Sequence, residues 1–65
     1  MENKLLMLLT SRLEERRTQL IESLADGAVK DHSEYRYLCG TIRGLAFAQS
    51  EIEDLVRKLR DFDDE

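Results

Sequence analysis

The sequence predicts an all-α protein, an antiparallel hairpin of two helices, and three observations support this fold class. Apolar side chains recur in alternating steps of three and four residues from Tyr35 to Leu59, the period of a helical stripe that packs against other helices. Proline is absent and charged residues make up 37% of the chain, which is typical of long solvated helices. No segment shows the two-residue alternation of a half-buried strand.

The first helix is expected at about residues 3–25. One apolar stripe follows its length, and Leu5 and Ile21 widen this stripe. The stripe consists of Leu6, Leu9, Leu13, Arg17, Leu20 and Leu24. Arg17 interrupts it, and its aliphatic stem can lie along the stripe while its charged head reaches water. Gly27 follows Ala25 and Asp26, and glycine can adopt the left-handed conformation that ends a helix.

The second helix is expected at about residues 32–60. Asp31 and Glu34 have the spacing of a capping box, in which Asp31 accepts a hydrogen bond from the helix and Glu34 reaches back to the amide of Asp31. A short connection makes the two helices antiparallel neighbours. The chain then forms one domain over residues 1–60, and residues 61–65 form an acidic tail that is expected to fray.

The stripe of the second helix is expected to pack on the first helix. It consists of Tyr35, Leu38, Ile42, Leu45, Gln49, Ile52, Val56 and Leu59. Five of these residues are expected to be buried there: Leu38, Ile42, Leu45, Ile52 and Leu59. Gln49 has two interpretations. It can fix register or oligomeric state by pairing with an equivalent polar group, or it can lie at the rim with its amide in solvent.

The chain has more apolar surface than one hairpin can cover, because residues 5–9 project apolar groups in every direction and the second helix carries an additional stripe. Contiguous exposed apolar surface usually marks an interface, although single exposed leucines are common. The sequence therefore predicts an interaction surface. Its residues are Leu5, Leu6, Leu8, Leu9, Tyr37, Gly40, Gly44, Phe47, Ala48, Leu55 and Phe62.

Gly40, Gly44 and Ala48 follow one another at intervals of four residues. Glycine in a helix interior costs about 1 kcal/mol relative to alanine, so two glycines one turn apart require a reason. Close approach by another helix or a bulky side chain is one reason, and Phe47 of a neighbouring chain could insert there. A bend in the helix is the other.

A chain of 65 residues is marginally stable alone. Its single cysteine, Cys39, and single histidine, His32, exclude an intramolecular disulfide and a His/Cys metal site within one chain. Oligomerisation or docking on a larger protein is therefore the expected source of stability. A free thiol and no recognisable signal peptide indicate the cytoplasm. Residues 5–9 are too short to cross a membrane.

No catalytic constellation, cofactor motif or small-molecule site is recognisable, and the protein is not expected to be an enzyme. Four arginines could contact phosphates or an acidic partner. They are Arg12, Arg16, Arg36 and Arg43. The net charge of −4 argues against nucleic acid, because a nucleic-acid-binding surface usually dominates the net charge. Salt bridges to acidic residues of the same or another chain are the ordinary interpretation.

The segment from Tyr35 to Leu45, with the pattern Tyr-x-Tyr-Leu-x-Gly-x-Ile-x-Gly-Leu followed by a charged helix, resembles small proteins encoded among the virion genes of tailed bacteriophages. The resemblance covers roughly residues 13–59 and includes no diagnostic catalytic motif. It implies a structural or assembly component of a phage particle, attached to capsid, portal or tail proteins. The expected location is then the host cytoplasm and the virion.

The architecture is also similar to that of plasmid copy-number regulators of the Rop type, which are helical hairpins that dimerise into four-helix bundles and bind RNA loops. The hairpin, the single cysteine and the acidic tail carry this likeness, which rests on the fold alone. It implies a small regulatory module that contacts RNA or a partner helix through an arginine face. Such a function requires Arg12, Arg16, Arg36 and Arg43 to share one exposed surface.

Overall fold

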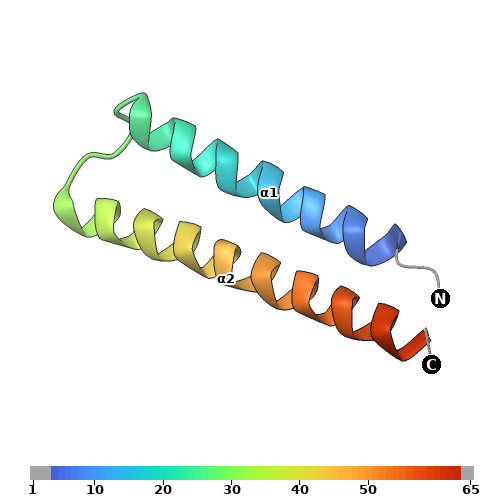
Figure 1. Ribbon diagram of the computed structural model, residues 1–65. Coiled ribbons are helices and arrows are strands. Elements are labelled where there is room, and N and C mark those ends of the chain that lie inside the picture. The colour runs from blue at the N-terminus through green and yellow to red at the C-terminus, as the bar shows by residue number, and fades with distance from the viewer. Residues whose placement is uncertain (1–3, 64–65) are drawn as a thin grey trace.

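The computed structural model describes residues 4–63, with side chains up to residue 61. It consists of two helices, α1 (Lys4–Ala25) and α2 (His32–Asp63). The helices lie side by side and antiparallel, with the connection at one end of the molecule (Figure 1). The predicted all-α helical hairpin is therefore confirmed.

The end of α1 follows from Gly27, as the sequence predicts. Its φ of 77° lies in the left-handed region, which an L side chain adopts only at a cost. The Gly27 amide donates to the Leu24 carbonyl at 3.2 Å, and the Ala28 amide donates to the Ser23 carbonyl at 3.1 Å. These two bonds form a Schellman motif, which satisfies carbonyl groups that the helix end leaves without partners.

Asp31 begins α2. Its Oδ1 accepts a hydrogen bond from the Glu34 amide at 2.8 Å, and its carbonyl accepts from the Tyr35 amide at 3.0 Å. The return bond from the Asp31 amide to the Glu34 carboxylate is not formed within the described residues, so only half of the predicted capping box is present. The helix continues to Asp63, which places residues 61–63 in α2 and not in a separate tail.

The two helices meet along one line of facing residues, which we call the seam. In α1 the seam consists of Leu6, Thr10, Leu13, Arg17, Leu20 and Leu24, and in α2 of Leu38, Ile42, Leu45, Gln49, Ile52, Val56 and Leu59. The prediction placed Leu9 in this line, but Leu9 is exposed and Thr10 takes its position. Thr10 fits there because its hydroxyl donates to the Leu6 carbonyl at 3.1 Å. The predicted first residue of the α2 stripe, Tyr35, is also exposed.

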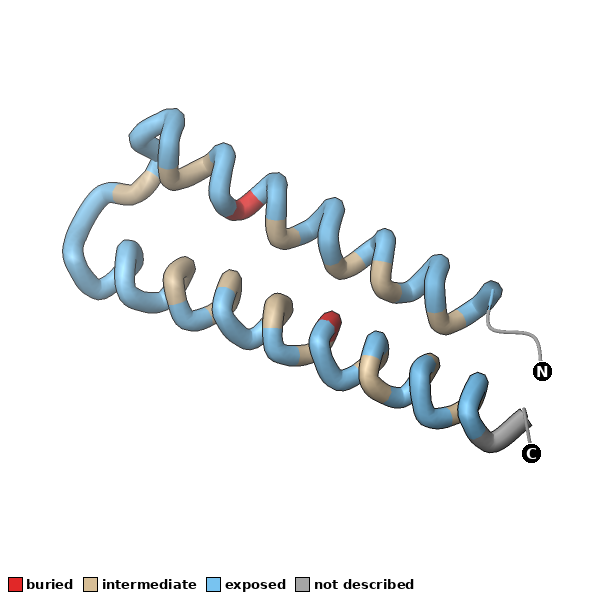
Figure 2. Tube along the Cα trace, in the orientation of Figure 1, coloured by how far each residue is buried: buried red, intermediate tan, exposed pale blue. Residues whose placement is uncertain are grey.

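Few side chains are buried in the hairpin. Leu20 and Gln49 are each 8% exposed, and every other described residue is half-buried or exposed (Figure 2). The five residues expected to be buried, Leu38, Ile42, Leu45, Ile52 and Leu59, point toward the partner helix but are only half-buried. Two helices leave both sides of each seam residue open, whereas a fully buried core residue needs neighbours on every side.

A polar cluster lies at the middle of the seam. The Gln49 amide nitrogen donates to Glu14 Oε1 at 2.9 Å, and the Arg17 guanidinium donates to the same oxygen at 2.8 Å. Arg17 thus lies along the seam, and its charged head pairs with the half-exposed carboxylate of Glu14. These two donors, the Gln49 amide foremost, hold the pKa of Glu14 below its ordinary value. The rim interpretation of Gln49 is also wrong, since its side chain is buried and bonds to the other helix.

The hairpin is elongated, with extents of 52 × 16 × 12 Å. Its radius of gyration is 15.4 Å, whereas a compact domain of this length has a radius of about 11 Å. Facing positions follow a simple register. Gln49 bonds to Glu14, and Thr10 and Met7 lie beside Glu53 and Val56, so the numbers of facing residues add up to about 63.

Candidate interaction surface

One side of the hairpin combines most of the residues that the sequence assigns to an interface. A residue that immediately precedes a seam residue is rotated about 100° from the seam. Because the helices are antiparallel, the residues that precede the seam residues of α1 and those that precede the seam residues of α2 lie on the same side of the molecule. We call this side the leading flank. Its residues are Leu5, Leu9, Arg12, Arg16, Gln19 and Ser23 of α1, and Tyr37, Thr41, Gly44, Ala48, Glu51, Leu55 and Lys58 of α2.

The α1 part of the leading flank is apolar near the start of the helix. Leu5 is 79% exposed and Leu9 is also exposed, as is Leu8 beside the flank. These leucines and Arg12 line a shallow hollow. Leu6 differs from the other predicted interface leucines, because it lies in the seam and is half-buried.

The α2 part continues this apolar surface. Leu55 is exposed and lies level with Leu9, and it shares a second shallow hollow with Glu51 and Lys58. Toward the connection, Ala48 is half-buried and Tyr37 is 72% exposed. Phe62 belongs to α2, but its side chain lies outside the described residues.

Gly40 and Gly44 lie within a continuous α2. A Cβ atom added at either glycine meets no atom within 4 Å. The hairpin therefore contains no close backbone approach at these glycines, and such an approach requires another molecule. Phe47, which is 67% exposed, lies on the side of α2 directed away from α1, by the helical turn of about 100° per residue.

The four arginines of interest are all exposed, but they do not form one patch. Arg12 and Arg16 belong to the leading flank. Arg36 and Arg43 lie on the side of α2 directed away from α1, because they are rotated by well over 100° from the seam.

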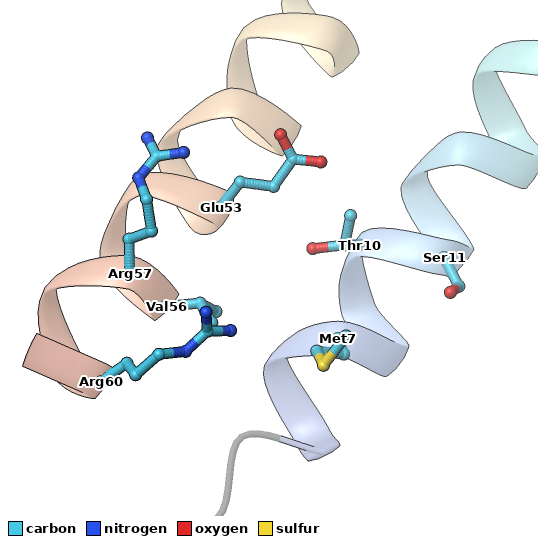
Figure 3. Close-up of a pocket in the computed structure, with 7 residues that line it drawn as sticks. All are labelled: Met7, Thr10, Ser11, Glu53, Val56, Arg57 and Arg60. Carbon is cyan, nitrogen blue, oxygen red and sulfur yellow. The ribbon is translucent and has the colours of Figure 1, made fainter. Parts of the chain in front are cut away.

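A groove that the sequence did not predict opens between the helices on the opposite flank (Figure 3). Met7, Thr10 and Ser11 form its α1 wall, and Glu53, Val56, Arg57 and Arg60 form its α2 wall. The Arg57 guanidinium donates to Asp54. Only Val56 belongs to a predicted stripe, and the groove could be found only once the register of the two helices was known.

The single cysteine and histidine occupy the first turns of α2. The rings of His32 and Tyr35 are stacked, with centroids 6.3 Å apart. Hydrogen bonding with the half-buried Cys39 thiol raises the pKa of Tyr35. His32 thus packs against the neighbouring turn, and Cys39 contacts Tyr35.

Within residues 4–63, no group of three or more His, Cys, Asp or Glu side chains is arranged to hold a metal ion. Neither α1 nor α2 has the length and hydrophobicity of a membrane-spanning segment. No family model, curated protein or solved structure matches the chain.

Proposed function

We propose that this protein is a non-enzymatic interaction module whose function is to pack its helices against other protein. One observation carries the proposal: among the described hydrophobic side chains only Leu20 is buried, while nine large ones are exposed. A hairpin of this kind leaves the hydrophobic driving force of folding largely unused.

The exposed area agrees with this proposal. A compact protein of 7.6 kDa exposes about 4300 Å², whereas this chain exposes 5375 Å². The excess of about 1100 Å² exceeds the area of about 800 Å² that each partner contributes to a standard interface. One additional protein surface would therefore cover it.

We further propose that the module is a structural or assembly component of a tailed-bacteriophage particle, attached to itself or to capsid, portal or tail proteins. The pattern from Tyr35 to Leu45 supports this setting. The exposed apolar surface agrees with attachment to other protein, because such surfaces mark protein–protein interfaces. The corresponding location is the host cytoplasm and the virion.

The native mass of the protein tests whether it functions as an interaction module. Light scattering at micromolar concentration should give a mass above that of one 7.6 kDa chain, or a stable complex with coat, portal or tail protein from the same source. A monomer that folds cooperatively and binds none of these proteins would contradict the proposal.

The virion setting has a separate test. Mass spectrometry of particles purified from the source should detect the chain in a constant ratio to the coat protein. Its absence from both particles and assembly intermediates would remove the virion setting and leave the interaction module in place.

The alternative is a regulatory module that binds RNA through an arginine face. The distribution of Arg12 and Arg16 on one side and Arg36 and Arg43 on another does not favour it. Salt-sensitive binding of RNA at low ionic strength would support this alternative, because phosphate contacts release counterions.

A further inference from the structure

We propose that the leading flank binds a second copy of this chain, with the two hairpins parallel and their connections at the same end of a four-helix bundle. This inference rests on the proposed function and specifies its partner. It is carried by three observations on the flank: its apolar end, its charges and its small residues.

A two-fold axis parallel to the helices places α1 of one copy over α2 of the other at the same level. Since facing residue numbers add up to about 63, the pairs across the dimer follow directly. Leu9 lies over Leu55 of the second copy, and Leu5 lies over its Lys58, whose aliphatic stem can cover an apolar side chain. Each contact occurs twice, as an interface with two-fold symmetry requires.

One pair of opposite charges on the flank meets in this arrangement. Arg12 lies over Glu51 of the second copy. Ion pairs join Arg17 to Glu14 and Arg57 to Asp54, whereas Arg12 and Glu51 form no ion pair with another described residue. Both are exposed and available for a contact between chains.

The shapes are complementary as well. Arg16 lies over Ala48 of the second copy and Gln19 lies over its Gly44, so the long side chains of α1 face the small residues of α2. The open space around Gly44 is then filled by the second copy. This contact gives a reason for a glycine that costs helix stability.

The reversed arrangement, with the connections at opposite ends, fits less well. When the two hairpins overlap over their full length, it places Arg12 of one copy over Arg16 of the other, and like charges at an interface are unfavourable. It also moves the exposed leucines away from each other, with Leu5 over Ser23 of the second copy. The parallel arrangement is therefore the one that the flank favours.

The orientation is tested by spin labels on the connection. In a Cys39→Ser, Ala28→Cys double variant, the label-to-label distance in the full-length dimer is measured by pulsed electron paramagnetic resonance. The parallel dimer predicts a distance within about 30 Å, because packed helix axes are about 8–10 Å apart. A reversed dimer gives a distance close to the hairpin length of 52 Å.

Charge reversal tests the contact itself. Arg12→Glu or Glu51→Arg should each raise the dimer dissociation constant about tenfold, because each pair occurs twice and becomes repulsive. The double variant with both changes should regain the dissociation constant of the natural chain. Arg36→Glu makes the same change of charge off the flank and should leave it unaltered. Circular dichroism checks that each variant keeps its helix content.

The outcomes separate this inference from the proposed function. A long label distance, or a dimer that is insensitive to both charge reversals, would overturn the inference and leave the interaction module intact. A chain that folds cooperatively as a monomer at every concentration would overturn the inference, and the proposed function would fall with it if that monomer also bound no coat, portal or tail protein.

Discussion

At the scale of single residues, the polar group in the middle of the seam determines how the helices align. The Gln49 amide bonds to Glu14 across the hairpin, and any shift in register breaks this bond. Arg17 Nε and Gln49 Oε1 are buried without hydrogen-bond partners among the described residues, which lowers stability. A polar residue at a helix seam typically exchanges stability for a defined register in this way.

The Glu14 carboxylate should make stability depend on pH. Hydrogen bonds from Gln49 and Arg17 lower the pKa of Glu14 below its ordinary value of 4.5. The ionised Glu14 carboxylate therefore contributes fully to the stability of the folded state above pH 4.5. This contribution disappears as the pH falls through the lower pKa that Glu14 has in the folded state. Glu14→Gln should lose less stability between pH 6 and pH 2 than the natural chain does, as measured by urea unfolding.

Glu15→Gln is the matched control for this prediction, because Glu15 is exposed on the same helix. It should keep the larger pH dependence. Equal pH dependence in the two variants would show that the Glu14 cluster does not contribute to stability in solution.

At the scale of the elements, the sequence predicted most of what the structure contains. Gly27 and Asp31 mark the helix ends because their roles depend on local backbone chemistry, and such signals can be read from sequence. The sequence pattern could not predict that Thr10 rather than Leu9 lies in the seam. A polar residue is not expected there, and Thr10 fits only because its hydroxyl forms a hydrogen bond within its own helix. The Glu14–Gln49 bond joins residues 35 positions apart and depends on a register that only the packed hairpin defines.

Gly27→Ala should lower the free energy of unfolding by about 1–2 kcal/mol, the cost of a left-handed conformation for a residue with a Cβ atom. Gly40→Ala is the matched control. It places the same methyl group inside a helix with open space around it, so it should raise the free energy by up to about 1 kcal/mol. Urea unfolding measures both, and changes of the same sign would contradict the assigned roles.

Gly44→Leu should raise the dimer dissociation constant at least about tenfold, because a large side chain there displaces the second copy. The same change improves helix propensity, so the isolated chain should not lose helix content. Ser50→Leu, at an exposed position off the leading flank, should leave the dissociation constant unaltered. Sedimentation equilibrium measures both, and an unaffected Gly44→Leu dimer would show that the glycine serves only the helix itself.

At the scale of the whole molecule, the sequence predicted an excess of apolar surface, and the hairpin exposes it. The prediction of a buried stripe was too strong, because it assumed that one partner helix encloses residues such as Ile42 and Leu45, which remain half-buried. The position of the leading flank depends on the antiparallel register, so it could be defined only from the packed structure.

The central claim is that this chain depends on another protein surface for its stability. Thermal unfolding followed by circular dichroism from about 1 μM to 1 mM tests this claim most directly, because an association that stabilises the folded state makes the midpoint rise with concentration. We expect such a rise, together with a mass above that of one chain at the upper concentrations. A sharp transition with a constant midpoint and the mass of a monomer throughout would contradict it.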